Sequence, residues 1–148
     1  MADPHPAVLM FVAQRHVEKQ VLEHLWERGY DDLTLAQGRI AARLGEHGSR
    51  LTELAEAAQV TKQSAGYLVD QLERAGYVER RPDPTDARAR LVCLSDRGRA
   101  VQQEARTVER RIAREWSRHL GAERYRELGA MLAELREITD PWWGGPSS

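Results

Sequence analysis

Residues 60–95 read VTKQSAGYLVDQLERAGYVERRPDPTDARARLVCLS, and this stretch decides the fold because its periodicity changes in the middle. In its first part apolar residues recur every three or four positions, which predicts an amphipathic helix capped by Thr61. The second part predicts a hairpin, with one strand at residues 77–81 and the returning strand at residues 90–94. Residues 82–86 supply a turn-rich tip between the strands. The sequence therefore predicts a helix followed directly by a hairpin with a long basic tip.

A shorter helix is predicted just before this stretch, at about residues 50–58, with only Gln59 and Val60 between the two helices. A helix-turn-helix needs small side chains where its helices touch, and Ala55 fits that contact. The start of the second helix then carries exposed polar side chains, where a recognition helix reads bases. The candidate base-reading residues are Thr61, Lys62, Gln63, Ser64, Gly66 and Tyr67.

These side chains suit the major groove of double-stranded DNA. Lys62 can donate to guanine or phosphate, and Gln63 can bind adenine through two hydrogen bonds. Ser64 can serve either base, and Tyr67 can reach a phosphate or a thymine methyl group. Taken alone, however, the same residues are typical of the polar first turn of a surface helix.

Four arginines of the hairpin favour the DNA-binding interpretation, because none has an obvious role in a core: Arg80, Arg81, Arg88 and Arg90. A wing beside DNA would place one arginine in the minor groove and others against phosphates. The alternative is a solvated charged hairpin, and the helix pair and hairpin in this order favour the wing.

Net charge gives no support to DNA binding, since 22 Lys and Arg residues against 23 Asp and Glu residues leave a formal charge of -1. From Lys62 to Arg99, eight cations stand against six acids, an excess of only two. What matters is therefore whether the arginines share a surface.

The rest of the chain is predicted to be helical. A first long helix covers about residues 6–28, and Thr34 caps a second helix that ends before Gly48. After the hairpin, Ser95 caps a long helix that Gly121 breaks. The last helix has a coiled-coil-like seam of Tyr125, Leu128, Leu132 and Leu135. The fold class is therefore mainly α with a small β-hairpin wing (α+β), in a single domain of residues 1–148.

Composition excludes several other classes of protein. The single Cys93 forms no disulfide and no zinc cluster, which fits a reducing compartment and indicates the cytoplasm. The longest apolar run, residues 7–13, is too short to cross a membrane. The five histidines are scattered, and neither an HExxH nor a GxSxG pattern is present, so we expect no enzyme, no cofactor and no metal.

Three blocks of the sequence resemble the MarR (multiple antibiotic resistance regulator) family of bacterial winged-helix repressors, over about residues 34–98. The blocks are VTKQS at 60–64, LERAGYVER at 72–80, and DPTDARARLV at 83–92 followed by Leu94, Ser95 and Gly98. The resemblance implies that Asp86 pairs with an arginine to shape the wing tip and that Arg88 enters the minor groove. Gly66 and Tyr67 depart from residues that many relatives carry. Gln59 stands where a turn glycine or asparagine is common, which is acceptable if the turn avoids positive φ.

The resemblance also implies a homodimer and an effector. Residues 6–30 and 99–140 would form the dimerisation region, and residues 34–98 the winged helix-turn-helix DNA-binding lobe. A small aromatic or anionic molecule would bind between the two and lower DNA affinity. The residues that could line such a cleft are His16, Trp26, Tyr30 and Arg39. The preferred alternative places Trp26 in the core and leaves His16 and Arg39 exposed, and it treats Cys93 as a buried hydrophobe rather than a redox-active thiolate.

The sequence thus predicts a ligand-responsive repressor that binds a pseudopalindromic operator as a homodimer. The alternative is a helical dimer that acts through protein contacts and has lost DNA binding. A missing wing arginine would mark that alternative, and Arg88 is present.

Overall fold

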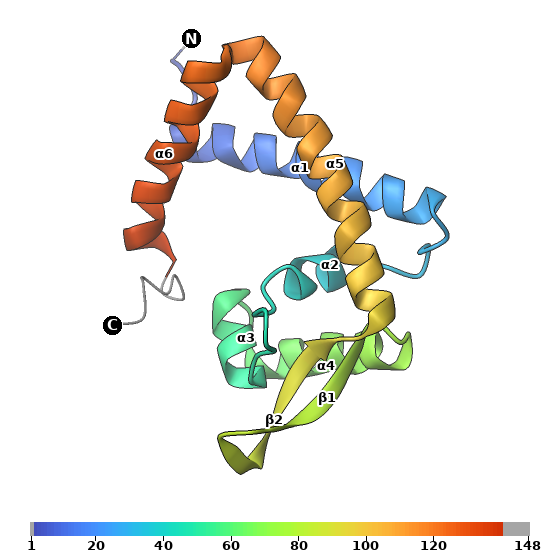
Figure 1. The fold of residues 1–148 in the computed structure, drawn as a ribbon. Helices are drawn as coiled ribbons and strands as arrows, with labels where there is room; N and C mark the ends of the chain where they lie inside the picture. The colour runs from blue at the N-terminus through green and yellow to red at the C-terminus, as the bar shows by residue number, and fades with distance from the viewer. Residues whose placement is uncertain (1, 141–148) are drawn as a thin grey trace.

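The computed structural model describes residues 2–140, which fold into six α-helices and one two-stranded antiparallel sheet (Figure 1). In chain order the elements are α1 (Pro6–Glu27), α2 (Leu35–Ala41), α3 (Leu51–Ala57), α4 (Lys62–Arg74), β1 (Val78–Asp83), β2 (Asp86–Leu94), α5 (Asp96–Leu120) and α6 (Ala122–Thr139). The predicted class, mainly α with a hairpin wing, is confirmed.

The long helices form a frame above a small lobe that contains α2, α3, α4 and the hairpin (Figure 1). Helix α1 crosses α5, and the crossing is marked by a hydrogen bond between His24 Nε2 and Glu104 Oε2 at 2.7 Å. Helix α6 folds back from α5 at Gly121, whose φ is +89°. The core of the lobe is formed by side chains from all its elements, chiefly Leu33, Ile40, Leu54, Ala55, Ala65, Val69, Leu72, Tyr77, Val78 and Val92.

Local signals position the helix starts as predicted. The Thr34 side chain accepts from the Gln37 amide, Thr61 from Ser64, and Ser95 from Gly98. Helix α2 is shorter than predicted, because it ends at Ala41 instead of continuing toward Gly48. The chain leaves the helix there so that Ser49 can pair with Val92 of β2 through two backbone hydrogen bonds of 2.8 and 3.0 Å.

The hairpin is longer than predicted, and its tip is shorter. Strands β1 and β2 reach Asp83 and Asp86, because the Asp83 carboxylate accepts hydrogen bonds from both the amide and the hydroxyl of Thr85 and closes the turn. Pro82 faces Arg90, whereas Asp83 faces Asp86. The three residues between those β2 partners, 87–89, therefore stand outside the regular register.

Three helices end in the same hydrogen-bonded motif, and one of the three has an unusual residue in it. After α1 and α4 the left-handed position is taken by Gly29 and Gly76, with φ of +95° and +83°. After α3 it is taken by Gln59 at φ +58°, with the Val60 amide bonded to the Ala55 carbonyl at 2.9 Å. The condition that this turn avoids positive φ is therefore not met, and Gln59 takes the left-handed conformation that closes the motif.

Gln59→Gly should raise the free energy of unfolding by about 0.5 kcal/mol. Left-handed geometry costs a residue with a Cβ about 1–2 kcal/mol, and glycine removes this cost. Glycine also loses about 0.5–1 kcal/mol more conformational entropy on folding, which offsets part of the gain. Urea denaturation measures the difference. Gln59→Ala is the control, because it shortens the side chain and keeps the Cβ, and should bring no such gain. A glycine variant less stable than the alanine variant would contradict the strain argument.

Candidate nucleic-acid interface

The exposed face of α4 carries five of the six predicted base-reading residues: Thr61, Lys62, Gln63, Ser64 and Tyr67. The opposite face is buried and consists of Ala65, Val69 and Leu72. Gly66 differs from the other five, because it is half-buried and a Cβ built there would lie 3.7 Å from Leu51 Cδ2 of α3. Position 66 therefore packs the two helices together, and the remaining five present polar groups to solvent.

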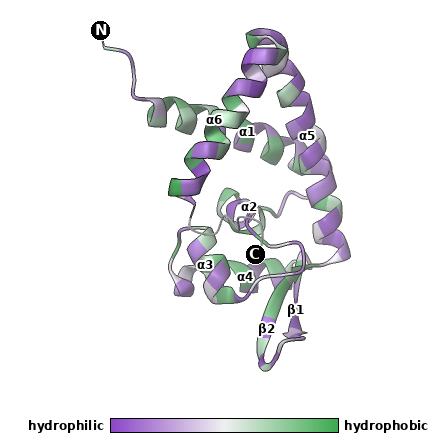
Figure 2. Cartoon of the chain, turned by 60° about the vertical axis from the view of Figure 1, so that its left-hand side comes forward, coloured by the Kyte–Doolittle hydropathy of each residue, from purple (hydrophilic) through white to green (hydrophobic). Residues whose placement is uncertain are grey.

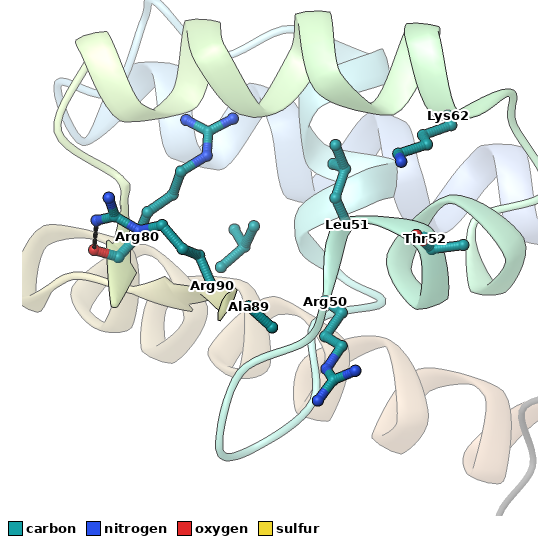
Figure 3. Close-up of a pocket in the computed structure, with 8 residues that line it drawn as sticks. Arg50, Leu51, Thr52, Lys62, Arg80, Ala89 and Arg90 are labelled. Carbon is teal, nitrogen blue, oxygen red and sulfur yellow. Dashed lines mark hydrogen bonds between the residues drawn. The ribbon is translucent and has the colours of Figure 1, made fainter. Parts of the chain in front are cut away.

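A hollow of about 400 Å³ connects the start of α4 with the wing (Figure 3). Its walls are formed by Arg50, Leu51, Thr52, Lys62, Arg80, Ala89, Arg90 and Val92. Lys62 comes from the recognition helix and Arg90 from the wing, so cations from both predicted elements line one surface. Arg50 and Thr52, which the sequence reasoning did not single out, belong to the same surface.

The wing arginines have different roles. Arg80 is held by Asp70 at 2.8 Å and Glu73 at 2.7 Å, both on α4, and its side chain is 24% exposed. These ion pairs, which the sequence does not reveal, fasten the wing to α4. Arg90 donates to the Arg80 carbonyl at 2.9 Å, the dashed bond in Figure 3. Arg81 pairs with Glu79 on its own strand.

Arg88 is the exception among these four arginines. It lies in the irregular 87–89 segment of β2, and its side chain is exposed. Within residues 2–140 its guanidinium makes no hydrogen bond or ion pair, while its backbone amide donates to Asp86 at 3.0 Å. Arg88 therefore projects an uncompensated positive charge next to the wing tip.

The aspartate that shapes the wing tip is Asp83 more than Asp86. Arg50 Nη2 lies 2.7 Å from Asp83 Oδ2 but 3.9 Å from Asp86 Oδ2, and the Asp83 side chain is only 6% exposed. The hydrogen bonds from Thr85, followed by that from Arg50, hold the pKa of Asp83 below its ordinary value. The resemblance implies a contact between Asp86 and an arginine. Such a contact is present, with Arg50, and it is the longer of the two Arg50–aspartate contacts. The sequence carries no local signal for the Arg50–Asp83 pair, because Arg50 and Asp83 lie 33 positions apart.

A second polar cluster joins the lobe to the frame. The Tyr77 hydroxyl donates to Asp32, and the Arg97 guanidinium lies 4.3 Å from the centre of the Tyr77 ring. Burial and the Asp32 carboxylate raise the pKa of the Tyr77 phenol far above its ordinary value. Tyr30, predicted as an effector residue, packs instead against Tyr77 with ring centres 6.3 Å apart.

A second cavity lies between α1, α2, α5 and α6, with a volume of about 1110 Å³. Of the four predicted effector residues only Arg39 lines it. Glu18 holds Arg39 through two bonds of 2.9 Å, which lower the pKa of the Glu18 carboxyl. His16 points away from the cavity, since positions 16 and 18 lie about 200° apart on a helix. Trp26 is 44% exposed rather than in the core, and its indole donates to the Leu33 carbonyl at 2.8 Å.

Residues 2–140 hold no group of three or more His, Cys, Asp or Glu residues placed to bind a metal ion. None of their helices is both long and apolar enough to cross a membrane. Cys93 is half-buried in β2.

The chain is similar to one family model and to several proteins of known structure. The model of the MarR family matches residues 31–89. A Mycobacterium tuberculosis MarR family protein in complex with salicylic acid is 29% identical, covering 90% of this chain and 97% of that chain with a TM-score of 0.64. A Thermotoga maritima transcriptional regulator is 26% identical, with coverages of 89% and 92% and a TM-score of 0.60. A mutant of S. aureus MepR bound to an oligodeoxyribonucleotide is 19% identical, with coverages of 92% and 99% and a TM-score of 0.57. A search of curated protein sequences gives no match.

The helix pair, the basic hollow and the hairpin define this chain as a winged helix-turn-helix protein. Within that class the resemblance to the MarR family is confirmed, because the family model matches residues 31–89 and the chain is similar over most of its length to solved transcription regulators of that family.

Proposed function

We propose that this protein is a ligand-responsive repressor that binds a pseudopalindromic DNA operator as a homodimer in the cytoplasm. The observation that carries the proposal is the hollow that Lys62 of α4 and Arg90 of the wing line together. Cations from both elements on one surface answer the objection raised by the net charge of -1. The lone, half-buried Cys93 suits the reducing compartment in which a bacterial regulator meets DNA.

The exposed face of α4 suits the major groove, and the wing suits the minor groove next to it. Lys62, Gln63 and Ser64 offer donors and acceptors to base edges from the first turn, and Tyr67, 63% exposed, offers an aromatic ring one turn further on. Arg88 offers a guanidinium that forms no ion pair within residues 2–140, which suits the strongly negative minor groove. Arg81 and Arg90 add positive charge for phosphates.

The proposed homodimer rests on apolar side chains that the single chain leaves exposed. On α1 they are Val8, Leu9, Phe11 and Val12, each at least 51% exposed. On α6 they are Met131, Leu132, Leu135 and Ile138, each at least 40% exposed. Figure 2 shows apolar segments on both helices. Monomers rarely expose such surface, and a two-fold pairing of residues 6–30 and 99–140 would cover it and set two α4 helices in successive major grooves.

The proposed effector site is the cavity between the frame and the lobe. Its walls combine aliphatic side chains with four arginines and three acids, and we infer that Arg106 or Arg39 would bind the carboxylate of a small aromatic acid there. The salicylic acid complex of the M. tuberculosis relative supports this class of ligand. Of the residues proposed from the sequence, Arg39 is kept and His16, Trp26 and Tyr30 are set aside.

Selection of randomised duplex DNA on the purified protein tests the proposal. We expect a two-fold-symmetric site with half-sites about one helical turn apart. Titration of that site against salt should give a linear loss of log affinity, with a slope of about 0.9 for each phosphate contacted. Sedimentation should find a dimer. Failure to enrich any sequence, with only weak salt-sensitive binding, would replace the proposal with a helical dimer that acts through protein contacts.

Gln63→Ala should relax the preference at one or two base pairs in each half-site. A bidentate contact to adenine discriminates by about 1–3 kcal/mol, and alanine cannot make it. Repeating the selection with the variant measures the change. Lys62→Ala is the matched control from the same turn, because loss of a phosphate contact should weaken all sequences alike. Unchanged preference in the Gln63 variant would remove this residue from base recognition.

A further inference from the structure

Arg50 joins the helix-turn-helix to the tip of the wing. It stands at the N-cap of α3, and its Nε and Nη2 atoms lie 2.9 and 2.7 Å from Asp83 Oδ2 at the far end of β1. Asp83 is the partner that is hidden, with a side chain 6% exposed, whereas the Arg50 side chain is 41% exposed. The contact spans 33 positions of sequence, so it restrains the wing in a way that bonds within the hairpin do not.

The backbone next to Arg50 is already attached to the wing. Ser49 pairs with Val92 through hydrogen bonds in both directions, which holds the base of the hairpin against the start of α3. Arg50 then reaches from this fixed point toward the tip. One hairpin is therefore held at two separated places, and its tilt relative to α3 is defined.

The buried Asp83 carboxylate connects Arg50 to the residues of the wing tip. Its second oxygen, Oδ1, accepts from the Thr85 amide at 2.8 Å and the Thr85 hydroxyl at 2.7 Å. Arg50 also approaches Asp86 at 3.9 Å, and Asp86 accepts from the Arg88 amide at 3.0 Å. Contacts thus run from α3 through two aspartates to the backbone of Arg88.

We propose that Arg50 is a positioning residue for DNA binding, which acts through Asp83 and Asp86 to aim Arg88 at the minor groove. The inference rests on the proposed function, in which Arg88 contacts DNA. Arg88 needs such help, because residues 87–89 stand outside the strand register and its own side chain has no partner within residues 2–140. Arg50 itself stays engaged with Asp83 while it does so.

A double-mutant cycle on the dimeric full chain tests this role, with affinity measured by fluorescence anisotropy on the selected operator. Arg88→Ala and Arg50→Met should each weaken binding roughly tenfold. In the Arg50→Met background, Arg88→Ala should then lower operator affinity less than about threefold. An arginine that no longer points at the minor groove contributes little to affinity, so its removal changes little. A general loss of folding would not produce this specific coupling. Two losses that multiply would overturn the proposal and make Arg50 an independent DNA contact.

Hydrogen exchange of the free protein gives a second readout that does not depend on DNA. Arg50→Met should speed exchange of the Thr85 and Arg88 amides at least tenfold and leave α4 unchanged. Arg74→Met, which removes an exposed arginine from the far end of α4, is the control and should change neither exchange nor coupling. Unchanged exchange in the Arg50 variant would overturn the proposal. A third outcome is faster exchange in Arg50→Met together with normal operator binding by Arg88→Ala. That outcome would contradict the proposed DNA contact of Arg88, and with it the role assigned to Arg50.

Discussion

Gly98→Ala should lower the free energy of unfolding by about 3 kcal/mol and loosen the joint between the wing and α5. A Cβ at this position would overlap the Tyr77 carbonyl oxygen and lie 3.0 Å from Leu94 Cδ2. The Tyr77 carbonyl cannot easily move, because it accepts the Ser95 amide and Ser95 caps α5 through the Gly98 amide. Overpacking of a close backbone contact costs about 1–3 kcal/mol or more.

Urea denaturation of the variant, with Gly66→Ala as its matched control, measures this cost. A Cβ at Gly66 meets only Leu51 at an ordinary 3.7 Å, so the control should gain about 0.5–1 kcal/mol from the better helix propensity of alanine. The two substitutions make the same chemical change in two helices and should move stability in opposite directions. Equal stability of the two variants would mean that α5 does not approach the hairpin as closely as the structure has it.

Arg88→Ala should weaken operator binding about tenfold and reduce the slope of log affinity against log salt by about one. The reason is that the Arg88 guanidinium forms no ion pair within residues 2–140, so no such pair has to break before it contacts DNA. Titration of a labelled operator at several salt concentrations measures both quantities. Unchanged affinity at moderate salt would show that the wing does not contact DNA through this residue.

Arg80→Met is the informative companion, because it removes the same charge from the same hairpin. Asp70 and Glu73 already neutralise Arg80 and hold it against α4. Its loss should therefore change the salt slope less than the loss of Arg88, while it lowers the melting temperature of the lobe. If the two variants had the same salt slope, the distinction between a fastening arginine and a DNA-facing arginine would be wrong.

Much of the fold could be predicted from the sequence, because its signals are local. Thr34, Thr61 and Ser95 each begin a helix as predicted, since a cap needs only a side-chain oxygen and an amide three residues on. The change of apolar period after Gly76 located the hairpin for the same reason. The buried face of α4 followed from 3.6-residue spacing alone.

The structure adds most where side chains of different residues meet. The hairpin tip is shorter than the sequence predicts, because the two hydrogen bonds of Asp83 to Thr85 are not visible in composition. The ion pairs of Arg80 are not visible either, because its acidic partners come from another element. Two of the predicted effector residues have other contacts in the structure: Tyr30 packs against Tyr77, and Trp26 bonds to the loop after α1.

The sequence by itself determined the class of this protein, the order of its helices, the start of its recognition helix and the location of its wing. These depend on periodicity, caps and turn residues, which act within a few positions of one another. Only the tertiary structure decided which arginines are free. Arg80 and Arg88 are the same residue type eight positions apart, and they differ because one folds back onto two carboxylates of α4 and the other stands outside the strand register. A charge is available to DNA only when no nearer acid compensates it, and that distance is set by packing.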